Sequence, residues 1–171
     1  MDKIRRHLLT GGLAATAGAV GAGMSWQHWK PSDATPEAIA GVWQHSFQDL
    51  QGTTVLLNTW RDKPMLLNFW ATWCPPCVEE MPMLDAFYQA QAGRCTIVGL
   101  AVDRVAAVRS FIEKQGITYP ILLSGTHGLD LGKSLGNDAG GLPFSAFFDG
   151  NGQLLKVKLG KLAQSDLTSW V

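Results

Sequence analysis

The sequence predicts an α/β fold in which a mixed central sheet is flanked by helices, with an N-terminal strand extension. Residues 65–71 and 95–102 form nearly continuous apolar runs, typical of strands that are buried on both faces of a sheet. Segments of helical character follow both runs, and a hairpin signal precedes the C-terminus. This order predicts one sheet with helices on both faces.

The remaining elements are assigned from apolar patterning and turn residues. Strands are expected at residues 43–50, 54–58, 65–71, 95–102, 121–123, 144–148 and 154–159. Helices are expected from residue 74 or 75 to about 92, and at 105–115, 130–135 and 165–170. The last two strands flank Asp149-Gly150-Asn151-Gly152, which favours a hairpin because glycine and asparagine tolerate positive φ.

The composition favours one folded domain and excludes several other classes. The chain has 171 residues, 46% of them hydrophobic, so it contains enough apolar surface for a sizeable core. Its 14 basic and 14 acidic side chains give a formal net charge of zero, so no basic surface for nucleic acid is expected. Three cysteines are too few for a disulfide scaffold.

Residues 1–24 are expected to be an export signal or a membrane anchor. Lys3, Arg5 and Arg6 precede an uncharged stretch, residues 8–24, which glycines make weaker than the roughly 20 apolar residues of a membrane span. Arg5 and Arg6 resemble a twin-arginine signal, although their flanks match it poorly. The alternative is a buried Gly/Ala-rich helix of the folded domain.

The charge pattern also predicts where the domain works. Basic residues before the apolar stretch keep the N-terminus inside and deliver the rest outside, to the periplasm or the outer face of the cytoplasmic membrane. Residues 25–40 include prolines and polar residues typical of a spacer, so the folded domain is expected over residues 41–171.

Cys74 and Cys77 are the main candidates for chemistry. They follow a buried strand and begin a helix, where free N–H groups and the helix dipole favour a thiolate. We expect Cys74 to be the exposed nucleophile and Cys77 the resolving thiol. Because Pro76 lacks an N–H, the N–H of Cys77 is expected to be the main donor to the Cys74 sulfur, so the Cys74 pKa should be only moderately lowered.

Other readings of the pair are less well supported. A zinc site needs two more ligands at similar spacing, and Cys95 and the four histidines do not supply them. A structural disulfide is the second alternative. Cys95 is expected to be a small buried hydrophobe.

The segment Leu-Asn-Phe-Trp-Ala-Thr-Trp-Cys-Pro-Pro-Cys-Val-Glu-Glu-Met-Pro, residues 67–82, closely resembles the active-site segment of TlpA-like thiol–disulfide reductases. These are exported proteins of thioredoxin-like fold, and the resemblance extends from about Trp43 to the C-terminus. It implies that Cys74 and Cys77 are the redox pair. It also implies that Pro143 is the cis proline facing the disulfide, which leaves the Leu142 backbone free to bind an extended client segment.

The resemblance also covers Pro82, Asn68 and Glu80. Pro82 corresponds to the proline that bends the active-site helix. Thioredoxin has a buried aspartate where this chain has Asn68, and asparagine cannot shuttle a proton. Glu80 lies on the same helical face as Cys77 and matches an acidic residue of the TlpA-like branch, so it is the candidate acid–base group for Cys77. The alternative is that Glu79 and Glu80 only complement the first helical turn.

Trp70 and Trp73 are expected either to shape the surface around Cys74, with Trp73 contacting a client, or to be packing aromatics. The predicted activity is reduction of client-protein disulfides by a monomer that has no cofactor and no resident metal. The resemblance implies electrons from a membrane donor and a client in cytochrome c maturation or a related thiol pathway.

The competing functions are an oxidant of the same fold and a copper-delivering chaperone. The direction of exchange depends on small differences in thiolate stability that the sequence does not specify. A copper chaperone would use Cys74 and Cys77 together with His127. A peroxidase is disfavoured because the chain has a Cys-X-X-Cys pair instead of a single peroxidatic cysteine.

Overall fold

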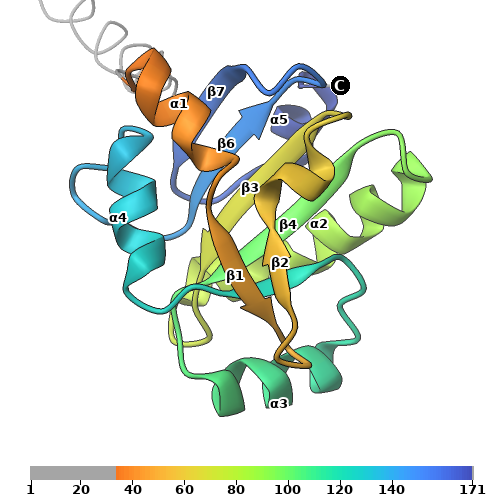
Figure 1. The fold of residues 1–171 in the computed structure, drawn as a ribbon. Coiled ribbons are helices and arrows are strands. Elements are labelled where there is room, and N and C mark those ends of the chain that lie inside the picture. Colours follow the sequence, from red (N-terminus) through yellow and green to blue (C-terminus); the bar gives the residue numbers. More distant parts are fainter. Residues whose placement is uncertain (1–33, 171) are drawn as a thin grey trace, which may run out of the picture.

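The computed structural model describes residues 34–170, in which seven strands form one sheet in the order β2-β1-β5-β4-β3-β6-β7 (Figure 1). The neighbouring strands β3, β4 and β5 are parallel, whereas β6 is antiparallel to β3. The sheet is therefore mixed, as predicted. The strands are β1 (Ser46–Asp49), β2 (Thr54–Leu56), β3 (Met65–Trp70), β4 (Thr96–Ala101), β5 (Ile121–Leu123), β6 (Phe144–Phe148) and β7 (Leu154–Leu159).

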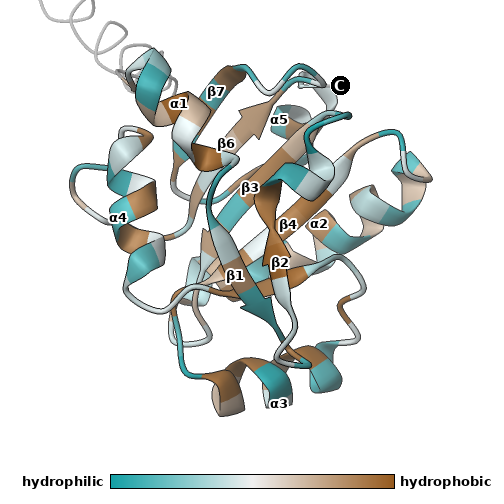
Figure 2. Cartoon of the chain, viewed as in Figure 1, coloured by the Kyte–Doolittle hydropathy of each residue, from teal (hydrophilic) through white to brown (hydrophobic). Residues whose placement is uncertain are grey.

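Helices cover both faces of this sheet. One apolar cluster joins it to α2, α3 and α5, and a second joins its other face to α1 and α4. Figure 2 shows α3 alternating between hydrophobic and hydrophilic residues, as expected of a helix with one side against the core. The helices are α1 (Pro36–Val42), α2 (Pro75–Gln91), α3 (Val105–Gln115), α4 (His127–Ser134) and α5 (Gln164–Thr168), and Leu57–Trp60 form a short 3-10 helix, η1.

The central strand β3 supplies side chains to both clusters. Leu66 and Trp70 belong to the cluster beneath α2, whereas Met65, Leu67 and Phe69 belong to the other. This alternation follows from the two-residue period of a strand, and it explains why nearly every residue of the strand is apolar. Residue 68 therefore faces α2, and this is the one polar position of β3.

The main difference from the sequence prediction is α1, which begins at Pro36 within the expected spacer of residues 25–40. The Oγ1 of Thr35 accepts a hydrogen bond from the N–H of Ala38, and Pro36 occupies the first turn. Both are helix-start signals. The helix is retained because Val42 is buried in the second cluster.

The expected signal or anchor, residues 1–24, and the first part of the spacer lie outside the described residues. No helix among residues 34–170 is both long and apolar enough to span a membrane.

Replacing Gly99 with alanine should destabilise the protein by about 1–3 kcal/mol, because it overpacks the core. A Cβ at this position of β4 would lie 2.6 Å from the Ile121 Cδ1, 3.0 Å from Tyr119 and 3.1 Å from Trp70. Urea unfolding of the oxidised protein measures the effect. Gly41→Ala is the control, since nothing lies within 4 Å of its Cβ; equal unfolding midpoints for the two variants would contradict the prediction.

Candidate active site

The two cysteines lie where β3 passes into α2, and they form a disulfide. Cys74 is the N-cap residue of α2 in an extended conformation, and Pro75 is the first helical residue. Because proline has no N–H, it is well suited to a position whose N–H would have no helical partner. The prediction of a cysteine pair at a helix N-terminus is confirmed.

The cysteines are less accessible than predicted. Cys77 is fully buried, and Cys74 is only 5% exposed, so the description of Cys74 as an exposed nucleophile is wrong for this disulfide form. Cys74 remains the more accessible of the two. Its side chain makes no capping hydrogen bond here, and the expected bond from the N–H of Cys77 concerns the thiolate and stays a prediction.

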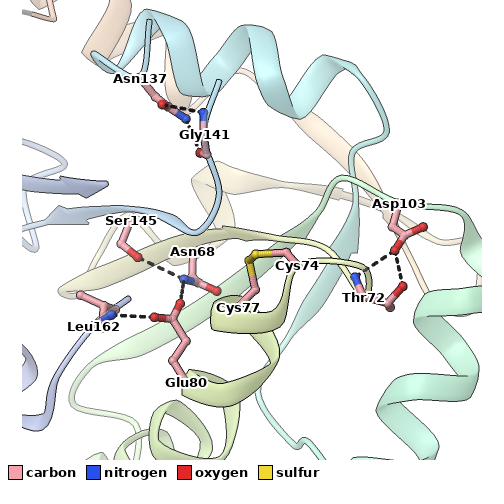
Figure 3. Close-up of a disulfide and its surroundings, with 10 residues drawn as sticks. All are labelled: Asn68, Thr72, Cys74, Cys77, Glu80, Asp103, Asn137, Gly141, Ser145 and Leu162. Carbon is pink, nitrogen blue, oxygen red and sulfur yellow. Dashed lines mark hydrogen bonds between the residues drawn. A yellow bond between two sulfur atoms is a disulfide. The ribbon is translucent and has the colours of Figure 1, made fainter. Parts of the chain in front are cut away.

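Asp103 anchors the loop that leads to Cys74. Its Oδ2 accepts hydrogen bonds from the backbone N–H of Thr72 at 2.9 Å and from the Thr72 hydroxyl at 2.5 Å (Figure 3). Burial acts to raise the pKa of Asp103, but the hydrogen bonds from Thr72 and from the N–H of Arg104 outweigh it and lower that pKa. Sequence reasoning missed Asp103, although a signal was present. Asp103 follows β4, and the parallel neighbours β3 and β4 end at the same edge of the sheet, so a residue after β4 lies near the loop after β3.

A second loop approaches the site through the cis peptide bond between Leu142 and Pro143, which confirms the expected cis proline. The Asn137 side chain holds this loop: its Nδ2 donates to the carbonyl of Gly141 at 2.9 Å, and its Oδ1 accepts from the N–H of Gly141 at 3.1 Å (Figure 3). Neither of these bonds uses the N–H or carbonyl of Leu142, whose side chain packs against the cluster that contains both cysteines.

A groove of about 670 Å³ lies beside the cis-proline loop. Much of its lining is apolar or lacks a side chain, including Gly141, Leu142, Phe144, Val157 and Leu159. Leu159 is 46% exposed in β7, an edge strand of the sheet. The groove therefore offers an apolar surface continuous with Leu142.

Glu80 is buried on the core side of α2, with 1% exposure. Its Oε1 accepts a hydrogen bond from Asn68 Nδ2 at 2.8 Å, and its Oε2 accepts one from the N–H of Leu162 at 2.6 Å (Figure 3). Desolvation raises the pKa of Glu80 to about 7, although these two bonds and the charges of Lys158 and Lys161 act to lower it. A carboxyl group with this pKa exchanges its proton near neutral pH.

The two adjacent glutamates have different environments. Glu79 is exposed and pairs with Lys161 at 2.7 Å. The first turn of α2 contains no acidic residue, so the alternative in which Glu79 and Glu80 only complement that turn is wrong. Sequence reasoning did not identify Leu162, because a backbone N–H 82 residues away leaves no side-chain signal.

The two tryptophans are also separated. Trp70 is fully buried, and its ring centroid lies 5.4 Å from that of Phe111. Trp70 is therefore a packing aromatic and does not shape the surface. Trp73 is 66% exposed. Its position one residue before Cys74 makes it the large exposed aromatic nearest in sequence to the disulfide.

Cys95 is a buried free thiol, as expected, and burial raises its pKa to about 11. His127 is the first residue of α4. Within residues 34–170, no three His, Cys, Asp or Glu side chains are grouped so as to hold a metal ion. His127 therefore does not complete a copper site with the cysteine pair in this structure.

A disulfide at a helix N-terminus, beside a cis-proline loop and on a mixed sheet covered on both faces, defines a thiol–disulfide oxidoreductase of thioredoxin-like fold. A sequence model described as Redoxin matches residues 30–169, and the chain belongs to the Redoxin family.

Similar proteins have the same class of activity in their names. Thiol-disulfide oxidoreductase ResA of Geobacillus thermodenitrificans is 32% identical over 124 residues, which cover 70% of this chain and 67% of that protein. ResA of Bacillus anthracis is 28% identical over 131 residues, covering 72% and 70%. The crystal structure of a thioredoxin-family thiol:disulfide interchange protein from Chlorobium tepidum is 27% identical with a TM-score of 0.69, covering 83% of this chain and 97% of that one.

Glu80→Gln should change how stability depends on pH. The pKa of Glu80 is about 7 in the folded protein, compared with 4.5 for a glutamate in water, so folding favours the protonated form. Ionisation therefore costs wild-type stability progressively between about pH 4.5 and 7, by up to about 3 kcal/mol at 1.4 kcal/mol per pKa unit.

The measurement is urea unfolding of the oxidised proteins at several pH values. The glutamine variant should gain stability relative to wild type as pH rises to 7, and the difference should then stay constant. Glu79→Gln is the control, because Glu79 is exposed. A difference between wild type and Glu80→Gln that does not depend on pH would contradict the assignment.

Proposed function

We propose that this chain is an exported reductase of disulfides in client proteins. Support for the direction and the location comes from the resemblance to TlpA-like reductases and from the charge pattern of residues 1–24. The observation that carries the proposal is the position of the slightly accessible Cys74 in a disulfide with the fully buried Cys77. A client disulfide therefore meets Cys74 first.

The reaction begins when the Cys74 thiolate attacks one sulfur of the client disulfide. The client S–S bond breaks, a mixed disulfide forms, and the other client sulfur leaves as a thiolate that takes a proton from water. Cys77 then gives its proton to the Glu80 carboxylate and attacks the Cys74 sulfur. The second client sulfur leaves as a thiolate that takes a proton from water, and the two electrons of the dithiol now belong to the client.

Glu80 suits this role for two reasons. It lies three residues after Cys77, about one turn along α2, and its pKa of about 7 allows both proton uptake and release near neutral pH. Its burial excludes water from the carboxylate, so proton transfer from Cys77 does not have to displace a hydration shell.

Client binding is assigned to the cis-proline loop and its neighbours. The N–H and carbonyl of Leu142 can pair with an extended client segment, Pro143 orients that backbone, and Trp73 supplies an exposed aromatic surface. The adjacent groove takes an apolar client side chain near the cysteine. We assign the client to cytochrome c maturation or a related thiol pathway, with a membrane electron donor that re-reduces Cys74 and Cys77 and with residues 1–24 as the tether or signal.

The direct test combines insulin reduction with client trapping. Reduced wild-type protein should reduce insulin, and Cys77→Ser, expressed with residues 1–24 in an exporting bacterium, should retain clients as mixed disulfides on Cys74. Glu80→Gln should accumulate the same species transiently because resolution slows.

Cys74→Ser is the matched control for trapping and should retain nothing. No trapped client, together with no insulin reduction, would overturn the reductase assignment. Trapped proteins that are already found as dithiols in cells lacking this chain would instead favour an oxidant.

Leu159→Glu should weaken client binding without affecting the redox pair. A carboxylate in the apolar groove opposes burial of an apolar client side chain, so KM for a peptide disulfide with a leucine next to its cysteine should rise at least about fivefold. The rate of reduction of the oxidised protein by dithiothreitol should stay the same. Leu155→Glu is the control, because Leu155 is similarly exposed on β7 but does not line the groove; equal KM changes in both variants would contradict the assignment.

A further inference from the structure

We propose that Asn68 is the positioning residue of the Cys77–Glu80 pair: its Nδ2 holds the carboxylate, and its Oδ1 accepts a hydrogen bond from the Cys77 thiol in the reduced protein. The inference rests on the proposed role of Cys77 as the resolving thiol. It gives the asparagine a function distinct from proton shuttling.

The Nδ2 end of Asn68 has two acceptors. It donates to Glu80 Oε1 at 2.8 Å and to Ser145 Oγ at 3.1 Å, and Ser145 is its partner in the β3–β6 register. A side-chain amide has two N–H hydrogens, so these two bonds use both. When Glu80 is ionised its carboxylate only accepts hydrogen bonds, so in that state the amide nitrogen, and not the oxygen, faces Glu80.

The oxygen of the Asn68 side-chain amide lacks a hydrogen-bond donor. Asn68 is fully buried, and its Oδ1 has no hydrogen-bond partner among the described residues. In Figure 3 this oxygen lies on the side of the amide turned toward the cysteine pair, away from Ser145. Buried acceptors without a donor are uncommon in folded proteins, so this one requires a physical reason.

The oxidation state of the cysteines supplies that reason. In the disulfide, the sulfur of Cys77 carries no proton and has nothing to donate. Reduction adds two electrons and two protons, which break the S–S bond and give two thiols. The Cys77 S–H then becomes a donor on the side toward which Oδ1 is turned, so in the proposed arrangement Oδ1 gains its hydrogen bond only in the reduced state.

Two consequences follow for the chemistry. The bond to Oδ1 stabilises the dithiol relative to the disulfide and raises the pKa of the Cys77 thiol. It also holds that thiol next to the carboxylate that the same amide positions. During resolution the proton passes from Cys77 to Glu80 directly, while Asn68 neither gains nor loses a proton.

The charged and titratable groups around this amide limit the interpretation of any pH effect. Glu80 itself is on α2, Lys158 is on β7, and Lys161 lies in the link to α5; both lysines act on the Glu80 carboxylate. Tyr119, which precedes β5, is affected by the Glu80 charge as well. Asn68→Leu keeps these four side chains and is similar in size to asparagine, but it also removes the Nδ2 hydrogen bond that lowers the Glu80 pKa. The S–H measurement described below reports on Cys77 itself and therefore separates the two effects.

The first test uses the wild-type protein, so its result cannot be affected by misfolding of a variant. The Asn68 side-chain carbonyl carbon is followed by NMR at pH 8, where the Glu80 carboxyl group is ionised, in the oxidised and reduced protein. Its chemical shift should move downfield on reduction, because the carbonyl oxygen gains a hydrogen bond. An unchanged shift would overturn the proposal.

The second test measures redox equilibrium with glutathione. Asn68→Leu should shift the equilibrium about three- to fivefold toward the disulfide, as expected for loss of one hydrogen bond present only in the dithiol. Ser145→Ala is the control and should shift it less than twofold, because it leaves the Oδ1 side of the amide intact. Equal shifts in the two variants would overturn the proposal.

A spectroscopic readout separates positioning from packing. In a Cys74→Ser/Cys95→Ala background, Cys77 is the only thiol, and its S–H stretching band should move to higher frequency when Asn68→Leu is added. Neither measurement involves a client. If the redox equilibrium and the S–H band shift as expected but no client is reduced, the proposed function alone is rejected. If the S–H band of Cys77 does not move in Asn68→Leu, the role of Asn68 is rejected.

Discussion

Burial of the Glu80 carboxylate is the constraint on which the surrounding structure depends. Removing a carboxylate from water is costly unless hydrogen-bond donors replace the solvent. The donors here come from β3, through Asn68, and from the link between β7 and α5, through the N–H of Leu162. The only polar residues of β3 and β6, Asn68 and Ser145, lie opposite each other in this network. The sheet, α2 and the C-terminal segment thus converge on one charge.

The fold was largely predictable because most elements have strong local signals. The apolar run of β3, the helical pattern of residues 105–115 and the Asp-Gly-Asn-Gly hairpin each indicate the observed element. The helix α1 was missed because the prolines and polar residues before Gly41 suggested a spacer. Thr35 and Pro36 do carry helix-start signals, but such a short helix is stabilised mainly by packing of Val42, which a local pattern does not reveal.

The site was predictable near the cysteines and much less so beyond them. Spacing along α2 was enough to place Glu80 on the same side as Cys77, and the resemblance supplied the cis Pro143. Trp70 is buried because it lies in a strand that is covered on both faces. The sequence pattern already indicated such a strand, so burial of Trp70 could have been predicted. The hydrogen bonds from the N–H of Leu162 to Glu80 and from Thr72 to Asp103 join segments that are far apart in the sequence, so no local pattern predicts them.

The two hydrogen bonds between Asn137 and Gly141 have a consequence for the affinity with which this loop can bind another chain. They fix the two peptide units on either side of Gly141, which lead into Leu142, while no client is present. A loop that is already ordered loses little conformational entropy on association, so affinity does not depend on a costly folding step at the surface. In the proposed role of this loop as the client site, it would accept many sequences, since it would pair with the extended backbone that all of them share. Discrimination among clients then rests on the side chains that flank the cysteine.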